Sequence, residues 1–298
     1  MLELKEVELQ DRDWVAPLMK KSGLRGSEFT FSNLYNWSRT YNVRIGQHSG
    51  FFILKNAASA CRFLYPVGEG DFNSIIELFS QQAHEEGAPL VLYGVPVKGK
   101  EKLEELYPNR FEFEPVRDSF DYIYLREKLA TLSGKKLHGK RNHINRFIEN
   151  NPDWKYEQIS AENLAEAFAM SLEWCKTNGC DDGDDNQSLQ REACAVKSGL
   201  NNYEYLGLTG GLLRVDGRVV AFTFGSRVTE DTFVVHVEKA FSEIQGAYPM
   251  INQQFVINEL ESYTYVNRED DVGDPGLRKA KESYQPFEMY ERYVAKER

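Results

Sequence analysis

The predicted secondary-structure elements occur in the same order in both halves of the chain. Each half reads as a β-hairpin, a strand, a long helix, a short strand, a second helix and a closing strand segment. These elements fall at 41–54, 61–67, 71–86, 89–93, 100–107 and 111–124 in the first half, and at 211–227, 232–239, 246–262, 263–266, 275–284 and 287–295 in the second. The Asp216-Gly217 pair gives the second hairpin a strong turn signal. The repeated order predicts two α+β domains of similar architecture.

A basic segment joins the two halves. Residues 126–146 contain seven Lys or Arg and a single acid, Glu127. A helix is expected from Ser133 to Asn150, because Pro152 blocks its continuation. We therefore expect an N-terminal domain at 1–125, a basic linking helix at 126–152, and a C-terminal domain with the candidate active site at 153–298.

Arg141 interrupts an apolar stripe of this linking helix. Leu137, Ile144 and Ile148 share its face at helical spacing. A guanidinium there either pairs with a structural carboxylate or holds a phosphate or carboxylate ligand with its planar fork. The flanking cations, such as Lys140, form either a solvated face or a landing site for polyphosphate or RNA.

Near the C-terminus, a lysine is predicted on an apolar helix face. A helix opens at Asp274 with Pro275 in its first turn. Leu277, Lys281 and Tyr284 then share one side of this helix, together with Ala280. Lys281 either snorkels or pairs with a structural carboxylate, or it reaches an anionic or carbonyl group of a substrate.

The junction between the strand at 232–239 and the following helix is a candidate anion site. The Gly246-Ala247 pair stands at the helix start, where backbone amides bind a pyrophosphate or an oxyanion. Strict alternation places His236 and Glu238 on one face of the strand. Glu238 is a candidate general base or a partner for a buried cation, and His236 is interpreted as a core or rim residue. We propose no nucleophile here, because the sequence ties no Ser, His and Asp together.

Net charge, hydrophobic pattern and cysteine spacing argue against several classes of protein. The net charge of −10 disfavours indiscriminate binding to nucleic acid. The chain has no apolar stretch long enough for a membrane span and no signal peptide at its start, so a cytoplasmic protein with reduced cysteines is expected. No metal site is expected: the cysteines lack paired spacing, and the acidic loop 181–185 fails the calcium-loop pattern.

Several segments together resemble one family. They are Asp274-Pro-Gly-Leu-Arg-Lys-Ala-Lys281-Glu-Ser-Tyr284-Gln-Pro286, Glu291-Arg292-Tyr293, Ser27-Glu-Phe-Thr-Phe-Ser-Asn-Leu-Tyr35-Asn-Trp37 and Lys135-Lys-Leu-His-Gly-Lys140-Arg141-Asn142-His-Ile-Asn145-Arg-Phe147. They span nearly the whole chain and resemble the phosphatidylglycerol lysyltransferase C-terminal-domain family. That family is similar in fold to a tandem of GNAT-type acetyltransferase domains and to the Fem-type transferases, which take an amino acid from aminoacyl-tRNA. The resemblance implies two such domains, each a mixed, mostly antiparallel sheet flanked by helices.

The resemblance also implies transfer of an acyl or aminoacyl group to an amine or hydroxyl acceptor in the second half. By this resemblance, Lys281 is the candidate for contacting the substrate near the reacting carbonyl. Glu238, the candidate general base named above from its place on the strand, is the second expected catalytic residue. Lys140 and Arg141 would hold donor phosphate. The other expected substrate or donor contacts are Asn145, Gly246, Ala247, Tyr248, Asn267, Arg268, Arg278 and Tyr284.

The expected donor is aminoacyl-tRNA, whose acceptor stem would lie on the basic linking helix, and the expected acceptor is a small molecule or a peptide. A coenzyme A-dependent N-acyltransferase is the alternative, although Tyr248 stands where the pyrophosphate loop of acetyltransferases has a small residue. A non-catalytic module that binds a small ligand or a protein is a second alternative. The membrane-spanning half of the lysyltransferases is absent from this sequence, which disfavours a lipid acceptor.

Overall fold

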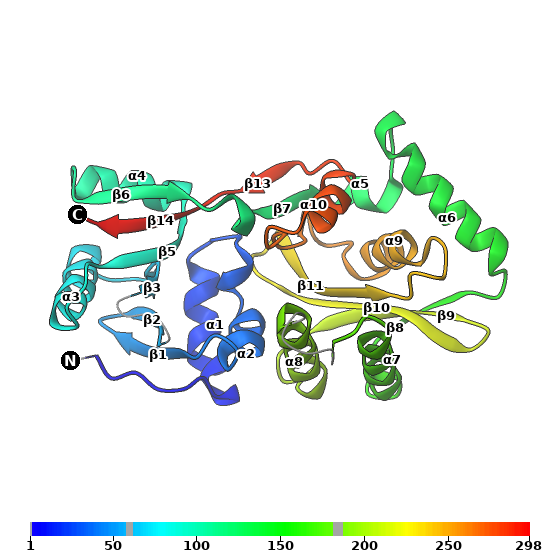
Figure 1. Cartoon of the computed structure of the whole chain (residues 1–298), viewed down its shortest axis with the longest axis horizontal. Coiled ribbons are helices and arrows are strands. Elements are labelled where there is room, and N and C mark those ends of the chain that lie inside the picture. The colour runs from blue at the N-terminus through cyan, green and yellow to red at the C-terminus, as the bar shows by residue number, and fades with distance from the viewer. Residues whose placement is uncertain (1, 58–61, 181–186) are drawn as a thin grey trace. The chain divides into compact units, whose positions relative to one another are not determined.

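The computed structural model describes residues 2–57, 62–180 and 187–298 (Figure 1). The expected acidic loop at 181–185 therefore lies outside the described residues. The chain divides into two compact units: Met1–Asp121 with Asp270–Asp274 and Met289–Arg298, and Tyr122–Glu269 with Pro275–Glu288. The first division falls near the expected boundary at residue 125. The linking helix belongs to the second unit, and the last ten residues of the chain return to the first.

The first unit is built on a seven-stranded sheet of order β1-β2-β3-β5-β14-β6, with β4 paired to β2. Its strands are β1 (Val43–His48), β2 (Phe51–Asn56), β3 (Arg62–Leu64), β4 (Val67–Gly68), β5 (Val91–Pro96), β6 (Phe111–Pro115) and β14 (Arg292–Glu297). Its helices are α1 (Arg12–Lys21), α2 (Phe31–Ser38), α3 (Phe72–Glu85) and α4 (Val97–Leu106). Only β3 and β5 among these strand pairs run parallel.

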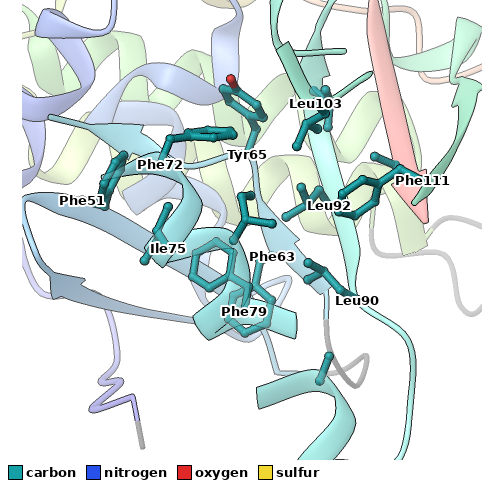
Figure 2. Close-up of a cluster of buried hydrophobic side chains, with 14 of the residues drawn as sticks. Phe51, Phe63, Tyr65, Phe72, Ile75, Phe79, Leu90, Leu92, Leu103 and Phe111 are labelled. Atoms are coloured by element: carbon teal, nitrogen blue, oxygen red, sulfur yellow. The ribbon is translucent and has the colours of Figure 1, made fainter. Parts of the chain in front are cut away.

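Aromatic and aliphatic side chains of α3 and the sheet form the core of this unit (Figure 2). Phe63 of β3 and Phe79 of α3 stack with ring centroids 4.3 Å apart. The apolar positions of α3 recur at helical spacing, so that Phe72, Ile75 and Phe79 all reach this core.

The C-terminal strand β14 is held in the first sheet by buried charges. Arg292 contacts Asp121 at 2.5 Å and Glu28 at 2.7 Å. Glu297 accepts hydrogen bonds from Ser80 and from Arg110, both at 2.8 Å. Burial raises the pKa of Glu28 to about 7, although Arg292 opposes the shift. The segment expected to close the second domain thus ends as a central strand of the first sheet, between β5 and β6.

The second unit contains a seven-stranded sheet of order β13-β7-β12-β11-β10-β9-β8, with β13 at the point where the chain returns to the first unit. Its strands are β7 (Asp121–Leu125), β8 (Lys155–Gln158), β9 (Thr209–Val215), β10 (Arg218–Arg227), β11 (Thr232–Ala240), β12 (Tyr265–Asn267) and β13 (Glu288–Tyr290). Its helices are α5 (Arg126–Thr131), α6 (His138–Asn150), α7 (Leu164–Thr177), α8 (Gln187–Asn201), α9 (Ala247–Glu259) and α10 (Pro275–Glu282). The predicted hairpin around Asp216-Gly217 and the helix start at Pro275 are confirmed. In Figure 1, α7 and α8 lie on one side of this sheet and α9 on the other.

Strand β11 carries a bulge at His236. Phe224 of β10 is opposite Val237, and the next residue, Gly225, is opposite Val235, so that His236 has no counterpart. A bulge of one residue exchanges the faces of all following side chains. Beyond it, Glu238 bonds to α9, whereas His236 bonds to Ser226 of β10. The prediction that His236 and Glu238 share a face is therefore wrong, because strict alternation does not allow for a bulge.

Two further sequence expectations concern cysteines and membranes. Cys175 and Cys180 are joined by a disulfide, which corrects the expectation of reduced thiols for this pair, whereas Cys194 is free and exposed. The two cysteines lie in α7 and directly after it, close enough for their side chains to meet. Among the described residues, no helix combines the length and apolar character needed to cross a lipid bilayer.

Candidate functional site

An ion pair with an amide beside it lies between β11, β12 and α9 in the second unit. Strands β11 and β12 pair in parallel only from Thr232 to Val234, although β11 continues to Ala240. Beyond this pairing, Glu238 of β11 and Arg268, the residue after β12, form an ion pair at 2.8 Å. Asn252 of α9 donates its side-chain amide to the other carboxylate oxygen of Glu238, also at 2.8 Å.

This cluster retains polar atoms that the protein leaves unused. The side chains of Glu238 and Arg268 are 12% and 11% exposed, and Asn252 is buried. Among the described residues, neither Nη1 of Arg268 nor Oδ1 of Asn252 makes a hydrogen bond of good geometry, although the Arg268 side chain lies close enough to the Tyr284 hydroxyl to oppose the rise in the pKa of Tyr284. The Asn252 amide orientation follows from chemistry, because a carboxylate accepts hydrogen bonds and so must face the NH₂ group. One donor on Arg268 and one acceptor on Asn252 therefore remain without a protein partner on the two side chains that bond to Glu238.

Two cationic side chains next to this cluster, Arg268 and Lys140, contact the ring of Tyr284. The guanidinium of Arg268 lies 4.6 Å from the ring centroid of Tyr284, and Lys140 Nζ lies 4.0 Å from the same centroid. Burial lowers the pKa of Lys140 to about 8, with a further lowering from Arg268 that Glu238 opposes. Lys140 can therefore exchange a proton near neutral pH. Burial also raises the pKa of Tyr284 above its usual value.

Lys281 lies next to this cluster and bonds to its backbone. Its Nζ donates to the carbonyl oxygen of Arg268 at 2.7 Å, and the residue is 8% exposed. Tyr124 of β7 donates its hydroxyl to the carbonyl oxygen of Lys281 at 2.7 Å. On the predicted apolar stripe, Lys281 and Tyr284 are buried whereas Leu277 is exposed. Lys281 thus fixes the backbone of Arg268 in this structure.

The two other predicted residues of the linking helix are not part of the cluster. Arg141 is half-buried and donates to the carbonyl oxygens of Leu132 and Gly134, the latter at 2.9 Å. Its partners are thus backbone carbonyls at the end of α5 and beyond it. Asn145 is exposed on α6.

The start of α9 is packed against α6. Gly246 has a φ of +86°, and a Cβ added there would lie 2.3 Å from the carbonyl oxygen of His143. The amide of Ala247 already donates to the carbonyl oxygen of Ile244 at 3.1 Å. Burial raises the pKa of Tyr248, the next residue. This helix start therefore offers an anion fewer free amides than the Gly246-Ala247 pair suggested.

Two residues predicted as substrate contacts, Asn267 and Arg278, lie outside the ion-pair cluster. Two residues that contact the cluster or Lys281 were not predicted. Asn267 is buried and accepts from the Glu269 amide at 2.7 Å, and Arg278 is half-buried on α10. Asn252 and Tyr124 were not predicted from the sequence. A usable signal existed for Asn252, because it shares a helix face with Phe255 and Val256, where a buried amide requires a partner. No group of His, Cys, Asp and Glu in the described part of the chain is placed to hold a metal ion.

The chain matches a known family over residues 20–296, described as phosphatidylglycerol lysyltransferase, C-terminal. It belongs to this family. Family membership and fold together support a transferase of acyl or aminoacyl groups. An uncharacterised protein of Mycoplasmoides gallisepticum is 26% identical over 196 residues, which cover 64% of this chain. The match spans 61% of the length of that relative.

Solved structures agree with the predicted fold. A conserved protein of unknown function from Bacteroides thetaiotaomicron is 41% identical, with a TM-score of 0.93 and full coverage of both chains. The structure of L-PGS from Bacillus licheniformis is 18% identical, with a TM-score of 0.65 and coverage of 98% and 93%. A GNAT-family acetyltransferase from Colwellia psychrerythraea is 12% identical, with a TM-score of 0.52 and 99% coverage of both chains. The predicted α+β class with two GNAT-like sheets flanked by helices is confirmed.

Proposed function

We propose that the second unit transfers an aminoacyl group from aminoacyl-tRNA to an amine or hydroxyl acceptor, with the aminoacyl group bound beside Glu238. The observation that carries this proposal is the pair of unused atoms, Nη1 of Arg268 and Oδ1 of Asn252. An aminoacyl ester has a carbonyl oxygen, which accepts a hydrogen bond, and an α-ammonium, which donates hydrogen bonds. The pair complements both groups.

The same pair distinguishes an aminoacyl group from an acetyl group. In this binding mode, Arg268 donates to the carbonyl oxygen and stabilises the oxyanion that forms when the acceptor attacks. Asn252 and Glu238 receive the α-ammonium. An acetyl group has no ammonium, so Oδ1 of Asn252 would stay without a partner and binding would lack the about 1.5 to 3 kcal/mol that a hydrogen bond to a charged group contributes. Coenzyme A as a donor is also disfavoured by the packing of Gly246 against α6.

In this proposal, Lys140 moves the proton of the acceptor. Its amine lies over the Tyr284 ring together with Arg268, and its pKa of about 8 provides a neutral fraction near physiological pH. As the acceptor nitrogen or oxygen bonds to the carbonyl carbon, its proton passes to Lys140. The ester bond to the ribose oxygen then breaks, and Lys140 returns the proton to that oxygen. Lys281 keeps Arg268 in place through the Arg268 carbonyl.

The binding step can be tested without knowing the acceptor. We would measure, by calorimetry, the affinity of the full chain for 3′-lysylamino-adenosine and 3′-acetylamino-adenosine, which are stable mimics of a charged tRNA end and of its acetyl counterpart. We expect the lysyl compound to bind at least about tenfold more tightly, which corresponds to about 1.4 kcal/mol. Asn252→Ala should abolish this preference. Glu243→Gln, at an exposed carboxylate, is the matched control and should keep it.

The transfer step needs a separate assay. Labelled lysyl-tRNA and labelled acetyl-coenzyme A would each be offered with phosphatidylglycerol vesicles and with a lysine-containing peptide. We expect label to move from lysyl-tRNA, and Arg268→Lys to reduce the rate about 100-fold or more through loss of an oxyanion donor. Equal affinity for the two adenosine compounds, or transfer from acetyl-coenzyme A alone, would refute the proposal.

A further inference from the structure

A serine, a histidine and a glutamate form a hydrogen-bonded chain on the face of β11 opposite Glu238. Oγ of Ser226 on β10 lies 2.8 Å from Nε2 of His236 on β11. Nδ1 of the same ring lies 2.8 Å from Oε1 of Glu269, which follows β12. The serine and the histidine lie 10 positions apart in the sequence, and the histidine and the glutamate lie 33 positions apart. The fold thus assembles an arrangement that the sequence does not reveal.

The glutamate determines the direction of these hydrogen bonds. A carboxylate accepts hydrogen bonds, so Nδ1 of His236 must carry the hydrogen that it donates to Glu269. In a neutral imidazole, Nε2 is then an acceptor, and the hydroxyl of Ser226 must donate to it. This is the tautomer in which a histidine can remove a proton from a serine.

Local backbone features hold His236 and Glu269 in place. The bulge at His236 directs the imidazole toward Ser226, and bulges often re-aim side chains in this way. Glu269 has a φ of +55°, which is uncommon outside glycine, and its amide is fixed by the side chain of Asn267 at 2.7 Å. Ser226 is 6% exposed and the His236 side chain is 5% exposed. Low exposure limits any reactant to a small group.

We propose that Ser226 is a nucleophile that accepts acyl groups from small carboxylic esters, with His236 as its base and Glu269 as a positioning residue. In this reaction, Ser226 Oγ bonds to the carbonyl carbon while its proton moves to Nε2 of His236. The ester carbon–oxygen bond breaks, and the departing alkoxide takes that proton. Water then attacks the acyl-serine with the same assistance and releases the carboxylate, which regenerates the serine.

This activity is separate from the proposed aminoacyl transfer. Ser226 and His236 bond to each other, whereas Glu238 bonds to Asn252 of α9 and to Arg268. The two groups of residues therefore use opposite sides of β11. Failure of one proposal leaves the other standing, because the ester assay needs neither tRNA nor an acceptor.

Acetylation by p-nitrophenyl acetate tests the proposal on the full chain. We expect a burst of nitrophenolate, one added acetyl group by intact mass spectrometry, and peptide mapping of that group to Ser226. Ser226→Ala should remove the label, and Ser242→Ala, at an exposed serine, should keep it. His236→Asn and Glu269→Gln should each slow acetylation by about 1000- to 10,000-fold. The first change removes the base, and in the second the glutamine amide would favour the wrong tautomer of His236.

Folding is verified by circular dichroism and by the thermal midpoint of each variant. If Ser226→Ala does not fold, Ser226→Cys replaces it, and the acetyl group should then be found as a thioester on residue 226. A folded wild-type chain that is not acetylated at Ser226 overturns the proposal. So does acetylation at an unchanged rate in His236→Asn, because the serine would then react without its base.

Discussion

Replacing Arg268 with methionine should destabilise the second unit strongly. The change removes the guanidinium but keeps an apolar side chain next to Tyr284. Among the described residues, Asn252 would then be the remaining hydrogen-bond partner of Glu238, which is 12% exposed. Breaking one side of such a buried pair costs about 3 to 5 kcal/mol. At about 2 to 4 °C per kcal/mol, the thermal midpoint should fall by about 6 to 20 °C.

A double-mutant cycle separates the pair from its surroundings. Arg268→Met, Glu238→Gln and the double variant would be unfolded in urea and followed by the fluorescence of Trp154 and Trp174. The double variant should recover at least about 2 kcal/mol relative to the sum of the single changes, because it leaves no unpaired charge.

An exposed ion pair of the same unit supplies the control for this cycle. Arg218 and Glu173 lie 2.5 Å apart but are 51% and 52% exposed, so Arg218→Met should cost at most about 1 kcal/mol. The reasoning fails if Arg268→Met costs no more than Arg218→Met, or if the changes at Arg268 and Glu238 are additive.

Two lysines near the ion pair, Lys281 and Lys140, give further predictions. Lys281→Met should lower the free energy of unfolding by about 1 to 3 kcal/mol, since the Arg268 carbonyl loses a charged donor. It should also weaken binding of 3′-lysylamino-adenosine. Wild-type values in both measurements would contradict this prediction. Lys140→Met should raise the thermal midpoint most below pH 8, where the wild-type chain must bury a charged amine. The folded pKa of Lys140 is lowered to about 8 from 10.5, so wild-type stability recovers as the pH rises between these values and the advantage of methionine shrinks. A midpoint difference that is constant from pH 7 to pH 10 would argue against burial of the charge.

The sequence predicted those parts of the fold that short-range chemistry determines. The turn at Asp216-Gly217 and the helix start at Pro275 depend on the residues at the turn and the cap themselves. By contrast, β14 forms pairs with β5 and β6, whose residues are far away in the sequence. Its placement depends on burying Arg292 against Asp121 and Glu28, and no local pattern contains those contacts.

The sequence predicted only part of the candidate site, again because local patterns do not contain contacts between distant residues. Arg268, Tyr284, Lys140 and Glu238 were all named from the sequence, and they lie together in the structure. The sequence could not show that the partners of Arg141 are backbone carbonyls, because a helix stripe indicates which way a side chain points and not what it meets. Nor could it show which atoms of the cluster stay unused.

The bulge at His236 explains why one strand can serve two groups of residues. With strict alternation along β11, His236 and Glu238 would point to the same side, and the imidazole would compete with Arg268 for the carboxylate. The extra residue turns Glu238 toward Asn252 of α9 and leaves His236 facing Ser226. Each ionisable group thereby acquires its own partners, a guanidinium and an amide for Glu238, and a hydroxyl and a second carboxylate for His236. The identity of the residues fixes the chemistry that is available, but the one-residue insertion decides which of them can act together.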